Sequence, residues 1–372
     1  KEVFHFNGEI NQSVDVSKNG GTASTKTLHK SNWAYQDKAR STLLKLDLVA
    51  GTNTITLKAK DGTILMDKIR VTDNFNVYYV ATNGDDSNAG TYWKPWKTLA
   101  KVSAAFETGG NGGFLNPGDR VLFRSGDTFK GELKVKRSGI EDNPIVISCY
   151  GPEELPILSG SGNVSGGDYL SAVNLVNASH ITMSHLWIKN DRQNDTRYGW
   201  NDKKSHGIYC QANKWGGTSS GLNFHNLKIT DVYSVGLPED FDAIKVTGLR
   251  FESDANEEDA EGNVTTEVRF ADVLIEDCYF SHIGKAGVWA THSGDWDNSD
   301  WTINRNMNFV IRNNTFFQTG GSGVILGKMY NAFVENNDFD QTGYSNGTET
   351  RLAGRGSGMW TCLLYTSDAA DE

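Results

Sequence analysis

The chain has 372 residues, of which 37% are apolar and 22% charged, a balance typical of a folded protein rather than a disordered one. No run approaches the ~18 apolar residues of a membrane-spanning helix, which argues against a transmembrane protein. The 46 acidic and 36 basic residues give a net charge of −10, which would repel the phosphates of a nucleic acid. We therefore expect no nucleic-acid partner.

Turn-forming residues dominate the composition. Forty glycines and 33 asparagines stand against only six prolines. Because glycine and asparagine tolerate the left-handed backbone region and are poor helix residues, this composition predicts many short strands joined by tight corners. The length exceeds the ~100–200 residues of one ordinary core, so we expect either two domains or one long repetitive domain. The four cysteines lack metal-ligand spacing and do not fix the redox compartment.

Residues 1–73 alternate between apolar and polar positions, as half-buried strands do. The alternation is clearest in three segments, 44–49, 54–59 and 64–71. With the turn Ala50-Gly-Thr-Asn53 between the first two, this pattern resembles the C-terminal half of a β-sandwich carbohydrate-binding module, of the kind that accompanies glycan-degrading enzymes. The resemblance implies a partial module over 1–73, and it favours missing sequence, including any signal peptide, before Lys1.

One amphipathic helix is predicted next. Pro95 suits a first helical position, and apolar residues follow it at helical spacing, at Trp96, Leu99, Val102 and Phe106. A strand-like segment, 116–124, comes after them. Helix and strand in this order resemble the opening of secreted right-handed parallel β-helix proteins, in which the helix covers the open end of the solenoid. The resemblance implies an all-β fold, with a right-handed parallel β-helix over 74–360.

A recurring pattern also predicts stacked coils. Apolar residues flank one variable residue in the segments 181–183, 222–224, 273–275, 309–311 and 332–334. Two positions after each segment lies a polar residue: His185, Asn226, Asp277, Asn313 and Asn336. Five positions after it lies an apolar anchor: Ile188, Ile229, Phe280, Phe316 and Phe339. Like residues would then stack ~4.8 Å apart, with the corner asparagines bonded into a ladder.

A second column starts at Gly207-Ile-Tyr, Asp242-Ala-Ile-Lys, Gly287-Val-Trp, Gly323-Val-Ile and Gly358-Met-Trp. If the middle apolar residues, Ile208, Ile244, Val288, Val324 and Met359, point inward, strand alternation sends the residue after each of them outward. The outward file would be Tyr209, Lys245, Trp289, Ile325 and Trp360. We interpret this face as a candidate sugar-binding groove, with Lys245 between Tyr209 and Trp289, and with His206 next to Asp242.

Two reactions could use residues near this groove. Hydrolysis of a glycosidic bond needs two carboxyl groups, and the candidates are Asp240, Asp242 and Asp295, with His206 beside them. Elimination from a uronic acid needs a base and a cation that neutralises the carboxylate. The candidates for elimination are Lys245, His292, Lys328 and Arg355, with Ca²⁺ as an optional cofactor. The tighter clustering of the carboxylates favours hydrolysis slightly, although Asp240 and Asp242 could equally be turn residues.

The acidic stretch 252–261 lacks the glycine and the spacing of a calcium loop, and we interpret it as a solvated loop. The large outward aromatic residues Trp289 and Trp360 favour a binding surface, and we assign Tyr209 to substrate binding with them. Residues 361–372 break the glycine-punctuated pattern and resemble a translated sequencing adapter, so we expect a non-native tail after a truncated solenoid.

The likeness to β-helix polysaccharide lyases and glycoside hydrolases covers Tyr78 to Trp360 and specifies the fold better than the reaction. The sequence carries no catalytic signature that can be transferred from either group. The resemblance implies a secreted or cell-surface enzyme that degrades a polysaccharide. The alternative is a non-catalytic glycan-binding or adhesin β-helix.

Overall fold

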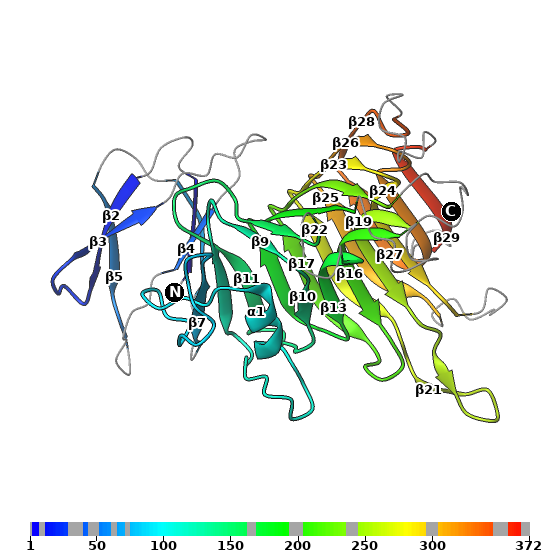
Figure 1. Cartoon of the computed structure of the whole chain (residues 1–372), viewed down its shortest axis with the longest axis horizontal. Coiled ribbons are helices and arrows are strands. Elements are labelled where there is room, and N and C mark those ends of the chain that lie inside the picture. Colours follow the sequence, from blue (N-terminus) through cyan, green and yellow to red (C-terminus); the bar gives the residue numbers. More distant parts are fainter. Residues whose placement is uncertain are drawn as a thin grey trace.

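A computed structural model describes residues 2–6, 12–28, 40–43, 52–60, 65–70, 75–161, 169–192, 204–235, 245–294, 304–344 and 356–365. Nearly all regular structure in these residues is β-strand. From residue 77 onward the strands wind into a right-handed parallel β-helix, whose coils follow one another along the long axis of the molecule (Figure 1). Each complete coil contributes one strand to each of three faces, which we call sheets 1, 2 and 3.

Sheet 1 contains, in spatial order, β10 (Leu133–Val135), β13 (Ser171–Val176), β16 (Ser205–Ala212), β19 (Val246–Ser253), β24 (Ala286–His292) and the first part of β27 (Val324–Glu335). Sheet 2 contains β7 (Val77–Val80), β8 (Arg120–Arg124), β11 (Ile145–Tyr150), β14 (Ile181–Ser184), β17 (Ser219–His225), β22 (Phe270–Glu276), β25 (Asn306–Arg312) and the second part of β27. Because β27 pairs with both β24 and β25, it joins sheets 1 and 2 into one ladder.

Sheet 3 contains β9 (Thr128–Lys130), β12 (Ile157–Ser159), β15 (Trp187–Asp191), β18 (Lys228–Tyr233), β23 (Tyr279–Ile283), β26 (Thr315–Thr319) and β28 (Asp338–Asp340). A short hairpin, β20 (Glu257–Glu258) with β21 (Val264–Thr266), projects between β19 and β22. The last strand, β29 (Met359–Tyr365), pairs with β27. The strand therefore continues past residue 361, where we predicted the tail to begin.

The repeat predicted from the sequence is confirmed residue by residue. Ile181, Leu222, Val273, Phe309 and Ala332 are register partners on successive strands of sheet 2. The five polar residues that follow these strands all have a φ of 52–57°. Asparagine and aspartate tolerate this left-handed conformation better than most residues, so the corner selects them.

The polar ladder lies one residue later than we predicted. Asn314 donates from Nδ2 to Asn337 Oδ1 at 2.9 Å, and its own Oδ1 accepts a hydrogen bond from the Cys278 amide at 2.9 Å. Asn313 and Asn336 supply the left-handed corner instead. The side chain directly after that corner can reach the next coil, which explains the shift by one position.

The core is a set of vertical columns of apolar side chains. Phe280, Phe316 and Phe339 stack almost parallel, with ring centroids 4.8 and 5.0 Å apart. A column of glycines lies beside these rings, at Gly207, Gly248, Gly287, Gly323 and Gly358. A Cβ on Gly287 would lie 2.4 Å from Phe316 Cδ1 and 2.7 Å from the Gly323 oxygen, so no larger residue fits. The phenylalanine stack therefore requires glycine where sheet 3 turns into sheet 1.

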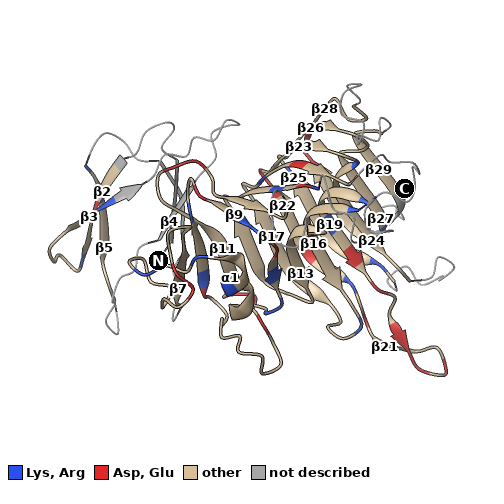
Figure 2. Ribbon diagram, in the orientation of Figure 1, with Lys and Arg blue, Asp and Glu red and all other residues tan. Residues whose placement is uncertain are grey.

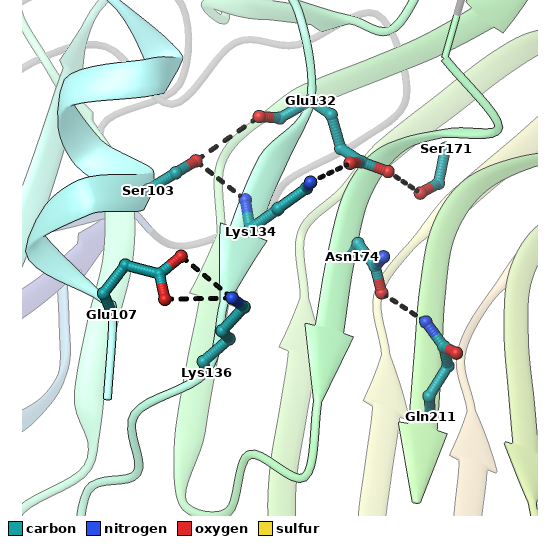
Figure 3. A network of polar contacts seen from close by, with 8 residues as sticks. All are labelled: Ser103, Glu107, Glu132, Lys134, Lys136, Ser171, Asn174 and Gln211. Atoms are coloured by element: carbon teal, nitrogen blue, oxygen red, sulfur yellow. Dashed lines mark hydrogen bonds and ion pairs between the residues drawn. The ribbon is translucent and has the colours of Figure 1, made fainter. Parts of the chain in front are cut away.

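Helix α1 (Leu99–Ala105) packs against β10 at the first coil, as Figure 1 shows. It begins four residues later than a start at Pro95 would require, because Thr98 is its N-cap and accepts a hydrogen bond from the Lys101 amide at 3.1 Å. Leu99, Val102 and Phe106 are buried, as the helical spacing predicted. Polar contacts also tie the helix to sheet 1, including Lys136 Nζ to Glu107 at 2.9 Å (Figure 3).

The N-terminal segment forms two antiparallel sheets. One has the order β4 (Arg40–Leu43), β1 (Glu2–Phe6) and β6 (Leu65–Arg70); the other has β3 (Ser24–Leu28), β2 (Gln12–Lys18) and β5 (Ile55–Ala59). The strands predicted over 54–59 and 64–71 are confirmed, whereas 44–49 lies outside the described residues. Assignment to a carbohydrate-binding sandwich stays a prediction.

Candidate active site on the outer face of sheet 1

Register on sheet 1 brings residues from distant parts of the sequence into one outward file. The partners on successive strands are Lys134, Asn174, Tyr209, Arg250, Trp289, Ile325 and Trp360. Figure 3 shows the beginning of this file, where Gln211 Nε2 donates to Asn174 Oδ1 at 2.7 Å. The predicted positions of Tyr209, Trp289, Ile325 and Trp360 in one file are confirmed.

The predicted position of Lys245 is wrong. Arg250 stands between Tyr209 and Trp289, and Lys245 precedes the strand, where its carbonyl accepts from the Ser205 amide. The aligned copy is Gly248-Leu-Arg, so Leu249 takes the inward position that we predicted for Ile244. The glycine column was the signal that could have identified this copy, because aspartate cannot replace glycine beside the packed ring of Phe280.

Lys245 nevertheless reaches the same site, through Glu252. The Lys245 ammonium donates to Glu252 Oε1 at 2.8 Å, the Tyr209 hydroxyl donates to Oε2 at 2.8 Å, and Arg250 Nη2 lies 3.6 Å from Oε1. Burial alone would raise the pKa of Glu252, but the charge of Arg250 and the bonds from Lys245 and Tyr209 lower it to about 2. Glu252 is therefore ionised at neutral pH, and our interpretation of it as part of a solvated loop is wrong.

The rings of Tyr209 and His206 lie in contact, and the pKa values of the two side chains are shifted in opposite directions. Their ring centroids are 4.7 Å apart, and His206 Nδ1 shares a 2.8 Å hydrogen bond with Thr247 Oγ1. Burial, and then the negative charge of Glu252, raise the pKa of Tyr209, which stays protonated. Burial, and then the positive charge of Arg250, hold the pKa of His206 well below its usual value. A neutral imidazole thus faces a protonated phenol.

Arg250 is the charged centre of the cluster, although only 1% of it is exposed. Its Nη2 donates to Thr291 Oγ1 at 2.8 Å, and its guanidinium lies 4.8 Å from the centroid of the Trp289 ring. Lys285 Nζ approaches the same ring at 4.9 Å. The Nε and Nη1 atoms of Arg250 are buried without a hydrogen-bond partner. In Figure 2, basic and acidic residues lie close together where β16, β19 and β24 run side by side.

Two predicted residues lie elsewhere on the fold. His292 is buried where sheet 1 ends; its Nε2 lies 2.7 Å from the Val268 carbonyl, its Nδ1 accepts from the Gly294 amide at 2.9 Å, and burial lowers its pKa to about 4. The Lys328 side chain is buried and donates to the Gly294 carbonyl. Both side chains are buried at the corner that follows sheet 1 and do not lie on its outer face.

The remaining candidates can be placed only in part. Asp240, Asp242, Asp295 and Arg355 lie outside the described residues. Trp360 is 53% exposed in the outward file. In the described ranges, no group of three or more His, Cys, Asp or Glu side chains is arranged to hold a metal ion, and no helix is long and apolar enough to cross a membrane.

Comparison with known proteins shows which solved structures have a similar fold. No family model matches the chain. The uncharacterised protein YwoF of Bacillus subtilis (strain 168) is 33% identical over 112 residues, which span 30% of this chain and 21% of that protein. The GH136 lacto-N-biosidase from Eubacterium ramulus superposes with a TM-score of 0.61 and 23% identity, over 78% of this chain and 50% of that one. A rhamnogalacturonan lyase gives a TM-score of 0.48 at 16% identity, over 80% of this chain and 64% of that one.

The chain thus spans half the length of the lacto-N-biosidase and about one fifth of YwoF. At this level of identity, the likeness to the lacto-N-biosidase concerns the fold. It confirms the right-handed parallel β-helix that the sequence predicted, and it leaves the reaction to be argued from the residues of the site.

Proposed function

We propose that the chain belongs to a polysaccharide-degrading enzyme that cleaves an extended acidic glycan along the outward file of sheet 1. The observation that carries the proposal is the contact between neutral His206 and protonated Tyr209, next to the cations Lys245 and Arg250. Two groups whose pKa values are pushed in opposite directions form a base and an acid at one pH. Lys245 would bind the carboxylate of a uronic acid, with the buried charge of Arg250 behind it.

This arrangement favours β-elimination. His206, only 1% of which is exposed, would take the C5 proton of a uronic acid that reaches it beside the Tyr209 ring, the electron pair would form the C4–C5 double bond, and the C4–O bond would break. Tyr209 would give its phenolic proton to the leaving oxygen. Lys245, whose side chain is 30% exposed, would neutralise the carboxylate, while Arg250 lies beneath it and keeps Glu252 ionised.

Hydrolysis is the second candidate, and the likeness to a lacto-N-biosidase favours it. Ionised Glu252 has the protonation state of a nucleophile or general base. With a pKa of about 2, however, it cannot be the general acid that hydrolysis also requires. That acid would come from Asp240, Asp242 or Asp295.

The product formed from a panel of acidic and neutral polysaccharides tests both reactions. Elimination predicts new absorbance from an unsaturated uronate, in step with the release of reducing ends and only on acidic glycans. Reducing ends without that absorbance would contradict elimination and support hydrolysis. Retention of a glycan without cleavage would support a non-catalytic binder or adhesin. Repeating the assay with a calcium chelator tests for Ca²⁺.

We further propose that the enzyme acts outside the cell or at its surface, because an extended polysaccharide cannot cross a membrane intact. Antibody detection of the full-length protein in the medium and surface fractions of its host tests this location. Detection in the cytoplasm alone would contradict it.

A further inference from the structure

Four aromatic side chains gather on the first coils, on sheet 2 and the segment that follows β7, away from the cluster around Glu252. We call Tyr79, Tyr92, Trp93 and Tyr150 the aromatic platform. The rings of Tyr79 and Tyr92 have centroids 5.3 Å apart, and those of Tyr79 and Tyr150 are 5.0 Å apart. Trp93 meets Tyr92 edge to face at 5.0 Å. Each ring is thus held by at least one other ring.

Trp93 is the most exposed large apolar side chain of the described residues, at 87%, and Tyr92 is 53% exposed. The backbone beneath them is fixed. Lys94 N donates to the Thr91 carbonyl at 3.0 Å, and the Tyr79 amide donates to the Gly90 carbonyl at 2.7 Å. An exposed ring on a fixed turn loses little conformational freedom when a ligand covers it, which favours binding.

Polar groups border the platform. Arg124 pairs with Asp127 at 2.8 Å and donates to Asn83 Oδ1 at 2.7 Å, at the position in register with Tyr150. Burial raises the pKa of Tyr150 to about 12, and it also raises the pKa of Tyr79, so both hydroxyls remain hydrogen-bond donors. The surface therefore combines an apolar ring face with a rim of donors and acceptors.

We propose that the aromatic platform is a second glycan-binding site, where a neutral pyranose ring stacks on Trp93 and its hydroxyl groups bond to the tyrosine and Arg124–Asp127 rim. A sugar ring has an apolar C–H face bordered by hydroxyl groups, which matches this surface. A second copy of the chain would instead require a larger and more continuous apolar patch. The rim pairs its own charges, so a neutral sugar fits better than an acidic one.

The chain offers a matched control in Trp215, which is 81% exposed. The ammonium of Lys214 lies 4.7 Å from the centroid of its ring. Among the described residues, none of the contacts between aromatic rings involves Trp215. Within the described ranges, Trp215 therefore matches Trp93 in exposure but lacks a neighbouring aromatic ring like the one that holds Trp93 in place.

Electrophoresis in gels that contain soluble xylan, galactomannan or β-glucan tests the proposal with the whole chain. At least one glycan should retard the wild type. Trp93→Ala should weaken that retention about tenfold, equivalent to ~1.4 kcal/mol, Trp93→Phe should restore part of it, and Trp215→Ala should leave it unchanged.

Equal retention of the wild type and Trp93→Ala, equal losses in both alanine variants, or no retardation of the wild type by any of the three glycans would each overturn the proposal. A lower particle mass for Trp93→Ala in sedimentation would overturn it too, because a second copy would then cover the platform. Retention that Trp93→Ala weakens, on a glycan that the chain does not cleave, would show that this site binds independently of the proposed reaction.

Discussion

The two sides of sheet 1 follow opposite rules, although the same coils build both. On the inner side and at the corner with sheet 3, like residues stack on like, as the glycine column and the three parallel phenylalanine rings show. On the outer side, Tyr209, Arg250 and Trp289 succeed one another, and no two neighbours in the file share a residue type. Residue types repeat where the packing of the coils requires them. Where the repetition stops on an outer face, packing does not explain which residues are present.

Removing one hydroxyl from the outer face should have the largest effect. Tyr209→Phe keeps the ring against His206 but removes the proposed acid, so we expect kcat to fall about 10²–10⁴-fold. Tyr279→Phe makes the same change on sheet 3 and should leave kcat near the wild-type value. Steady-state kinetics on an acidic glycan measures both. An unchanged kcat for Tyr209→Phe would show that the Tyr209 hydroxyl has no catalytic role.

A methyl group added to the inner column should have the next largest effect, on stability. Gly287→Ala would place a Cβ against Phe316 and the Gly323 carbonyl, so we expect the free energy of unfolding to fall by roughly 2–3 kcal/mol. Gly327→Ala is the matched control, because its nearest atoms lie 3.8 Å away. Urea titrations compare the two, and equal stabilities would show that the column tolerates a side chain.

Acidification should remove the stability that Glu252 contributes on the outer side of sheet 1. Its pKa is 4.5 in an ordinary setting and about 2 in the fold, so its contribution is present above pH 4.5 and is lost as the pH falls toward 2. Glu252→Gln removes this dependence, and a His206→Gln background in both proteins removes the buried imidazole whose pKa the charge of Glu252 also raises. Thermal unfolding from pH 6 to 2 should therefore show the two stability curves converging below pH 4.5. Parallel curves would contradict the ionic cluster.

The smallest effect is expected on the outer surface of sheet 2. Arg312 donates from Nε and Nη2 to Glu276 at 3.0 and 2.8 Å, but its side chain is 42% exposed. Solvent screening limits such a pair to at most ~0.5 kcal/mol, so Arg312→Ala should barely move the urea midpoint. A loss above ~1 kcal/mol would mean that charged outer positions also stabilise the coil.

The sequence predicts the solenoid well because its rules are local and repeated. The spacing from strand to left-handed corner to buried anchor is the same on five coils, so the copies align without any knowledge of the fold. The site obeys no such rule. Aligning Asp242 with the glycines predicts Lys245 at the position that Arg250 occupies.

Glu252 was missed for a different reason. In the sequence it opens an acidic stretch, and Figure 2 shows acidic residues continuing into the projecting hairpin that contains β21. Only the register shows that Glu252 is still part of β19, beside Lys245 and Tyr209. The local charge pattern is the same for a solvated acid and a buried one, so partners that lie 7 and 43 residues away decide the role of this carboxylate.

Strand β27 limits where the outer face of sheet 1 could be remodelled. The preceding coils leave sheet 1 through connections at 213–218, 254–269 and 293–305, which vary in length without disturbing the ladder. At β27 the backbone passes from one face to the next within a single strand, so this coil has no seam at which segments could be inserted. Attempts to introduce a new specificity should therefore insert segments into the three earlier connections. An insertion within β27 should prevent folding, because it interrupts the pairing of this strand with β24 and β25.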